Sequence, residues 1–304
     1  MFVGHALLAF AVVATAARRL GRSPERSLRL GAVAGLFAAV PDVDVVYAPV
    51  GLALRSVQTL GPDAFWATAN VIHRGPTHSL AMGTVLAVAV GLWATERRSA
   101  RAASAALVAA LVAVGAVGSG AVGGVVVLVY ALAGLAVAAV ARRCDVGAAA
   151  TFGVALVGLL SHPFGDLFTG SPPPLLYPLD VALVTERVLL YPDPTGHLLA
   201  AFALELGVVW LAVRAYVRLS GHRLRELVSP RASLGAGYAA AALALPAPTL
   251  ADSAHFVFSV LAVGVVGAPV RPLSGDDTRL RALVTGLTAV TLAAVAYAVA
   301  YGLL

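Results

Sequence analysis

His73–Ser79 (HRGPTHS) stands directly before the apolar run Leu80–Ala94 (LAMGTVLAVAVGLWA). Proline fits the first position of a helix and keeps the residue before it out of the helical conformation, so a helix is predicted to begin at Pro76. One histidine then lies in the preceding loop and the other in the first turn. The free N–H groups of that turn and the guanidinium of Arg74 face the same small volume, which favours a site for a metal ion and an anion together.

The composition excludes an ordinary soluble domain. Of 304 residues, 60% are hydrophobic and 12% charged, and the mean hydropathy is +0.90. Soluble chains carry about 25% charged and about 45–50% apolar residues. Long apolar segments separated by short charged loops therefore indicate an all-α, polytopic integral membrane protein. The first segment precedes its arginines rather than following them, so we expect no secretory signal peptide.

The apolar segments predict a bundle of about ten helices, some of them short or re-entrant. A hairpin at Gly118-Ser119-Gly120 is expected to divide a run that is too long for one span. Gly31-x-x-x-Gly35 permits two helices to pack closely. The predicted segments are 2–17, 30–47, 77–94, 102–117, 120–141, 147–160, 198–213, 234–250, 254–270 and 282–303.

The arginines predict the orientation of these segments. Every arginine except Arg55, Arg74 and Arg187 lies in alternate loops: 18–29, 95–101, 142–146, 214–233 and 271–281. The positive-inside rule places these loops in the cytoplasm and both termini outside. The net charge of +6 then reflects orientation and contact with anionic lipid, and no nucleic-acid partner is expected.

This topology collects polar residues at the segment ends on the outer side. The strongest candidates are His5, Asp42, Asp44, His73, His78, His162 and Asp166, while His197, Asp252, His255 and Glu205 are weaker ones. Ionisable groups beside membrane segments are usually functional. We therefore predict one shared site at the outer membrane boundary. Imidazole nitrogens and carboxylate oxygens suit a divalent metal, zinc first, with manganese or iron as alternatives.

Spacing sets limits on individual roles. His162 and Asp166 are four residues apart, so on a helix they share a face and can grip one ion. Asp42 and Asp44 point apart on a helix, so either the chain is extended there or one is a ligand and the other supports it. Arg74 is expected to bind a lipid phosphate or to stabilise a substrate anion. Thr77 and Ser79 are expected to be polar groups of the first helical turn rather than nucleophiles.

These motifs resemble those of the YdjM-like, LexA-regulated membrane-bound metal-dependent hydrolases. The resemblance rests on His5, Pro41-Asp42-Val43-Asp44, the HRGPTHS heptapeptide and Ser161-His162-x-x-x-Asp166, and it covers about residues 1–180. The motif order is also similar to the zinc-dependent phospholipase C and P1 nuclease group. That likeness implies phosphoester hydrolysis, with His5, Asp42 or Asp44, His73, His78, His162 and Asp166 as ligands. A His-x-x-x-Glu pair and an N-terminal tryptophan, found in that group, have no counterpart here.

We therefore expect a metal-dependent hydrolase in the cell membrane that uses a metal-activated water on a small-molecule or lipid phosphoester. An aspartate, Asp42 or Asp44, would orient the water, and Arg74 would stabilise the developing anion. Residues 1–200 form the predicted hydrolase-like domain, and residues 201–304 add transmembrane scaffold helices. The alternative is a non-enzymatic metal-binding membrane protein or transporter. Membrane lipid is the expected surrounding partner in both cases.

Overall fold

The computed structural model describes residues 2–46, 74–268 and 276–303. The chain forms two compact units, residues 1–188 and 189–304, and each is described by itself. Residue 200, where a division was expected, lies inside α8 (Pro194–Leu219). His73, one of the predicted ligands, lies outside the described residues, as does Arg55.

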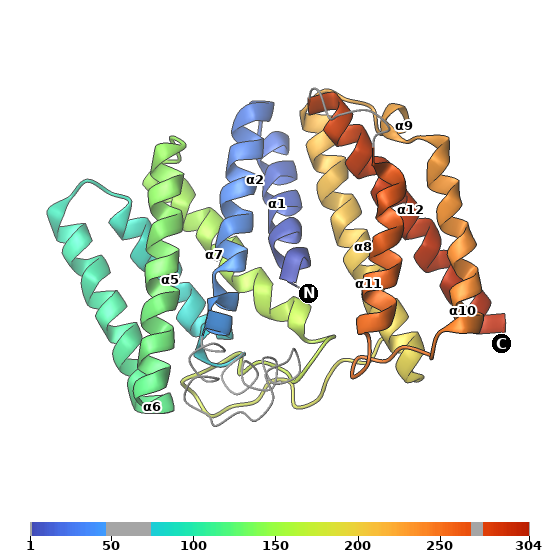
Figure 1. Cartoon of the computed structure of the whole chain (residues 1–304). Coiled ribbons are helices and arrows are strands. Elements are labelled where there is room, and N and C mark those ends of the chain that lie inside the picture. Colours follow the sequence, from blue (N-terminus) through green and yellow to red (C-terminus); the bar gives the residue numbers. More distant parts are fainter. Residues whose placement is uncertain (1, 47–73, 269–275, 304) are drawn as a thin grey trace. The chain divides into compact units, whose positions relative to one another are not determined.

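The first unit is a helical bundle (Figure 1). Its elements are α1 (Phe2–Arg19), α2 (Pro24–Ala39), η1 (Pro41–Val46), η2 (Pro76–His78), α5 (Leu80–Trp93), α6 (Arg98–Arg143) and α7 (Ala148–Asp166). Helix α2 begins earlier than the apolar pattern predicted, because Ser23 caps its first turn and Pro24 starts it. It ends before Pro41, and a short 3₁₀ helix follows instead of the predicted continuation to residue 47.

Close approach of backbones joins the first helices of the bundle. Gly31 and Gly35 of α2 lie directly against the backbone of α1, where any β-carbon would collide with a carbonyl oxygen. The predicted role of this glycine pair in helix packing is therefore confirmed. Helix α7 packs against both α1 and α2, and α5 packs against α7 and α6. Phe37, Leu86 and Tyr130 are the large, fully buried side chains at the centre of this core.

Helix α6 is two helices joined by a sharp turn. Ser119 and Gly120 have non-helical backbone angles, and Gly120 has φ of 69° and ψ of −174°. This region is accessible essentially to glycine alone. The two halves fold back on each other, with Gly115 facing Val127 and the carbonyl of Gly123. The predicted hairpin between segments 102–117 and 120–141 is confirmed.

The arginine-rich loops of the first unit meet at one end of the bundle. Arg29 Nη1 donates a hydrogen bond of 3.4 Å to the carbonyl of Cys144 and lies 3.9 Å from an Asp145 oxygen. The guanidinium of Arg142 lies 5.4 Å from the ring centre of Trp93. Loops 18–29, 95–101 and 142–146 are thus neighbours. The other ends of the helices that these loops join lie near His5 and Ser79, at the opposite end of the bundle.

The second unit is also helical. Its elements are α8 (Pro194–Leu219), α9 (Leu224–Leu227), η3 (Pro230–Ala240), α10 (Ala241–Ala244), α11 (Ala254–Ala262), η4 (Val263–Gly267) and α12 (Asp276–Leu303). The predicted segment 234–250 is not one α-helix. It is a 3₁₀ helix followed by a single α-helical turn that ends at Ala244, because Pro246 keeps Leu245 in an extended conformation. Phe256 and Tyr297 form the aromatic core of the second unit.

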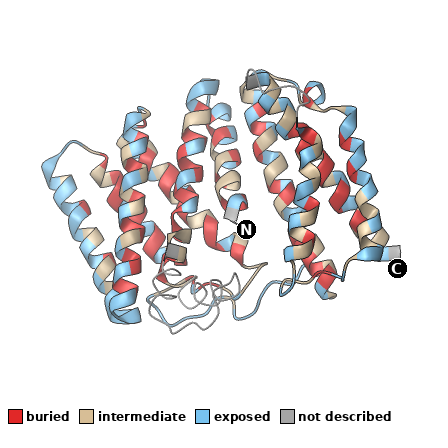
Figure 2. Ribbon diagram, in the orientation of Figure 1, coloured by how far each residue is buried: buried red, intermediate tan, exposed pale blue. Residues whose placement is uncertain are grey.

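All regular elements in the described residues are helices, and none is a strand, so the all-α prediction is confirmed for them. Four helices are long and apolar enough to cross a membrane: Arg98–Arg143, Ala148–Asp166, Pro194–Leu219 and Asp277–Gly302. Leu80–Trp93 and Ala254–Gly267 are shorter apolar helices. Figure 2 shows exposed residues along the outward sides of the helices, and among them are large apolar side chains such as Val117, Leu132 and Phe258. Such surfaces suit a lipid environment.

Candidate metal centre

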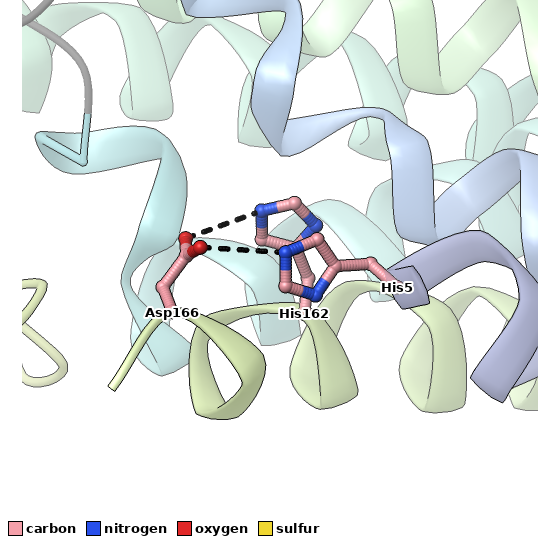
Figure 3. A group of neighbouring side chains, drawn as sticks. All are labelled: His5, His162 and Asp166. Carbon is pink, nitrogen blue, oxygen red and sulfur yellow. Dashed lines mark ion pairs between the residues drawn. The ribbon is translucent and has the colours of Figure 1, made fainter. Parts of the chain in front are cut away.

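Six of the seven strongest candidates lie together at one end of the first unit. His5 comes from α1, Asp42 and Asp44 from η1, His78 from η2, and His162 and Asp166 from α7. All are buried except Asp42, whose side chain is 16% exposed. Figure 3 shows His5 and His162 converging on the carboxylate of Asp166. Segments far apart in the sequence thus supply one compact group of imidazoles and carboxylates.

His162 is held so that one ring nitrogen faces this group. Helix α7 continues through Pro163 to Asp166, so His162 and Asp166 share one face as predicted. The other ring nitrogen, Nδ1, donates a hydrogen bond of 2.6 Å to the carbonyl of Ala38. That carbonyl lies near the end of α2, where helix carbonyls lack partners of their own. Because Nδ1 faces this carbonyl, Nε2 is the ring nitrogen turned toward the centre, where it can act as a ligand atom.

His78 is oriented in the same way by Thr77 and Asp44. The hydroxyl of Thr77 donates to Asp44 Oδ2 at 2.9 Å, so its oxygen can accept the Nδ1–H of His78, also at 2.9 Å. Asp44 Oδ2 lies 3.4 Å from the same ring nitrogen. Burial lowers the pKa of His78 below its ordinary value of 6.5. The ring is therefore neutral at pH 7, with the lone pair of Nε2 directed at the centre.

The facing atoms have the separations expected for ligands of one ion. Nε2 of His78 and Nε2 of His162 are 3.1 Å apart. Oδ2 of Asp166 lies 3.2 and 3.7 Å from these two nitrogens, and Oδ1 of Asp42 lies 3.8 and 3.4 Å from them. Tetrahedral bonds of about 2.0–2.2 Å separate two ligands by about 3.3–3.6 Å.

These atoms all present lone pairs and lack a donor among themselves. Asp166 Oδ2 is buried and has no hydrogen-bond partner in the described part of the chain. Burial alone would raise the pKa of Asp42, but the contact with the ring of His162 and the other neighbouring histidines outweigh it and lower that pKa, so Asp42 is ionised. A cation between the nitrogens and oxygens would remove their mutual repulsion. The residues present therefore fit a divalent metal ion.

His5 supports Asp166 from the other side. Its Nε2 lies 3.3 Å from Asp166 Oδ1, and its ring lies against that of His162, tilted by 35°, with centroids 3.9 Å apart. His5, His162 and Asp166 are themselves close enough to hold an ion. The ring of His5 lies so close to Gly165 that any β-carbon there would overlap it. Asp166 thus turns one oxygen toward His5 and the other toward His78.

The structure separates the two aspartates of the Pro-Asp-x-Asp motif. Asp42 faces the Nε2 atoms of His78 and His162. Asp44 lies behind His78, on its Nδ1 side, and also accepts the backbone N–H of Arg74 at 3.2 Å. The 3₁₀ helix at Pro41–Val46 makes this separation possible, because it turns the two side chains in different directions.

Arg74 lies against Asp166. Its Nη2 donates to Asp166 Oδ1 and to the hydroxyl of Thr169, both at 3.2 Å. Its Nη1 donates to the carbonyls of Asp166 and Ser171 at 3.2 and 3.0 Å. Its backbone is left-handed, with φ of 65°, a conformation that costs about 1–2 kcal/mol in a non-glycine residue. Both terminal nitrogens of the guanidinium are therefore bound within the protein.

Local partners are found for the candidates Ser79, His197, Asp252 and His255. Ser79 caps α5 by accepting the N–H groups of Ala81 and Met82, so the α-helix begins at Leu80, and only a short 3₁₀ helix begins at the predicted start, Pro76. In the second unit, His197 accepts the N–H of Leu190, and His255 pairs with Asp252 at 3.3 Å.

Three supporting groups were not predicted from the sequence. The carbonyl of Ala38 carries no side-chain signal at all. The hydroxyl of Thr77 was expected only as a helix-turn group, yet it bridges Asp44 and His78. The third is Gly165, which leaves room for the ring of His5. Its position directly before Asp166 is the only feature of the sequence that points to this role.

Fold and centre together define a multi-pass helical membrane protein with a buried His/Asp group that could hold a metal ion. The family comparison agrees with this class. The model of the YdjM inner membrane protein family matches residues 1–245, and the chain belongs to that family. The match extends beyond the expected limit near residue 180 and includes all of α8. No curated protein and no solved structure matches the chain.

Proposed function

We propose that this protein is a membrane-bound, metal-dependent hydrolase that cleaves phosphoesters. The observation that carries the proposal is the convergence of the Nε2 atoms of His78 and His162 on a buried oxygen of Asp166 that has no hydrogen-bond partner among the described residues. Two histidines and one carboxylate are a common ligand set of catalytic zinc, which keeps a further position open for water. Zinc is therefore the proposed ion. A bound zinc ion would lower the pKa of a water molecule and supply hydroxide near neutral pH.

Each side chain has a distinct proposed task. His78, His162 and Asp166 hold the ion, and Asp42 accepts a proton from the attacking water. Asp42 suits this task because it is ionised, lies within 3.4 Å of a ligand nitrogen and is the most exposed member of the group. Asp44 and the carbonyl of Ala38 fix the two rings from behind. Arg74 and His5 orient Asp166.

The substrate class follows from the similar order of motifs in the phospholipase C and P1 nuclease group. The centre lies at one end of the helices of the first unit, so a phospholipid headgroup could reach it from the membrane surface. A phospholipid and a water-soluble phosphodiester share the same scissile bond, and both belong in the assay. If the substrate reaches the centre through the bilayer, we expect the phospholipid to be cleaved faster than the water-soluble phosphodiester.

Metal content and hydrolysis of the purified full-length protein test the proposal. We expect close to one zinc ion per chain and cleavage of bis(4-nitrophenyl) phosphate or of a phospholipid in mixed micelles. His162→Ala should lose both. His222→Ala is the matched control, because His222 lies in the second unit and pairs with Asp277, and it should retain both. Wild-type protein without stoichiometric metal would overturn the proposal. Stoichiometric metal with neither ester cleaved would favour the non-enzymatic alternative.

We also propose that the centre faces the outer side of the membrane, with the arginine-rich loops inside. The single cysteine, Cys144, lies among those loops and reports their side. A membrane-impermeant maleimide should label it only after permeabilisation of the inner membrane. Leu179→Cys in a Cys144→Ala background places a thiol at an exposed position of the opposite end and should be labelled without permeabilisation. The reverse pattern would invert the orientation.

A further inference from the structure

A wedge-shaped cavity lies between the two halves of α6, at the end of the first unit that carries the arginines. The halves touch near Gly115 and Gly123. Figure 1 shows that they diverge away from the turn that joins them. The cavity has a volume of about 700 Å³. Its walls are Ala105, Val108, Ala109, Val112, Ala113 and Ala116 on one half and Leu128 and Leu135 on the other. Small side chains on the first half keep it open.

The mouth of the cavity is aromatic and basic. Trp93, Arg101 and Ser104 line the end where the halves separate. Trp93 also borders a second hollow of about 350 Å³, which Arg142 and Arg143 line. Tryptophan beside arginine is typical of the membrane interface. Both hollows that Trp93 borders are therefore lined by guanidinium groups, Arg101 in the first and Arg142 and Arg143 in the second.

The neighbouring acids do not neutralise these arginines. Glu96 is exposed in the same loop as Arg97 and Arg98. Asp145 follows Arg143 closely but lies 3.9 Å from Arg29. The mouth therefore keeps a net positive charge.

We propose that this wedge binds one anionic phospholipid, with its phosphate at the arginines and one acyl chain along α6. From Arg101 to Ala116 the helix rises about 22 Å, which exceeds half of a hydrocarbon core of about 30 Å. The cavity is thus long enough to hold an acyl chain across one leaflet of the bilayer. A free phosphate would leave the apolar walls of the wedge without a ligand. A second copy of the chain would bring the same positive charge, which would repel these arginines. Basic pockets between helices on the cytoplasmic side are known to select anionic headgroups.

Lipid retention by the purified full-length protein tests this site. Delipidated protein in detergent is titrated with phosphatidylglycerol or with phosphatidylcholine, and bound lipid is counted by native mass spectrometry. We expect preference for phosphatidylglycerol. Arg142→Gln/Arg143→Gln should weaken its binding about 30-fold, because each basic residue near the surface favours anionic lipid about fivefold. Ala109→Phe fills the wedge and should reduce binding while leaving the arginines in place.

Arg18→Gln/Arg19→Gln is the matched control. These arginines lie at the end of α1 in an arginine-rich loop but line neither hollow. The control should bind phosphatidylglycerol like the wild type, and circular dichroism with size-exclusion chromatography should show that every variant is folded. Equal weakening by both double substitutions would overturn the proposal in favour of general surface charge. Undiminished binding by folded Ala109→Phe would exclude the wedge as the place of the acyl chain.

Discussion

Asp44→Asn tests whether Asp44 acts on the metal through His78. Asp44 Oδ2 accepts the hydroxyl of Thr77 at 2.9 Å and the N–H of Arg74 at 3.2 Å, and it lies 3.4 Å from His78 Nδ1. Asparagine preserves the shape of the side chain but removes the negative charge. The substitution therefore leaves every proposed ligand in place and changes only the group behind one of them.

The expected effect is 10–100-fold weaker metal binding, the usual result of removing a carboxylate behind a ligating histidine. This corresponds to about 1.4–2.8 kcal/mol. With free metal at 100 times the wild-type Kd, binding stabilises the wild type by about 2.7 kcal/mol, whereas the variant would gain only about 0.4–1.4 kcal/mol. The metal-dependent rise in Tm should shrink accordingly.

Zinc affinity can be measured by competition with a chromophoric chelator, alongside melting curves with and without metal. Asp145→Asn is the matched control, since Asp145 is 91% exposed at the other end of the first unit. It should bind zinc like the wild type. Wild-type affinity in a folded Asp44→Asn protein would refute the assignment of Asp44 to the support of His78. Complete loss of metal would instead make Asp44 a ligand.

Three further outcomes are expected from the same geometry. Gly165→Ala should weaken metal binding, since its β-carbon overlaps the ring of His5, whereas Gly153→Ala in the same helix meets open space and should leave metal affinity unchanged; equal affinities would contradict this. Arg74→Lys should lower Tm, because one ammonium cannot replace a guanidinium with four hydrogen bonds, and an unchanged Tm with reduced kcat would point instead to a role on substrate. Gly120→Ala should destabilise the α6 hairpin by about 1–3 kcal/mol, visible as a lower Tm with metal affinity preserved.

The sequence predicted the helical membrane class well, because hydrophobicity and arginine placement are properties of single segments. It predicted the α6 hairpin for the same reason, since Gly118-Ser119-Gly120 is a local signal. The stretch 234–250 was predicted as one apolar helical segment, and the structure differs from that prediction. Its composition is apolar, but Pro246 and the close approach of Gly235 to the carbonyl of Ala289 produce a short 3₁₀ and α-helical piece instead.

The sequence predicted which residue types form the candidate metal centre, but it did not predict the role of each residue. His162 and Asp166 share a helical face at a fixed spacing, so their pairing follows from sequence alone. The distinction between Asp42 and Asp44 does not, because it depends on which side of His78 each carboxylate reaches. The binding of Arg74 to Asp166 likewise requires contact between residues 92 positions apart.

The amino-acid sequence by itself determined that this chain forms apolar helices with histidines and aspartates at their ends. Those features depend on local composition and periodicity. Only the tertiary structure decided that the Nδ1 atoms of His78 and His162 are engaged from behind, by Thr77 and by the carbonyl of Ala38. These contacts set which nitrogen of each ring carries the proton. A proton position depends on the partner across the fold, and no local pattern can encode it.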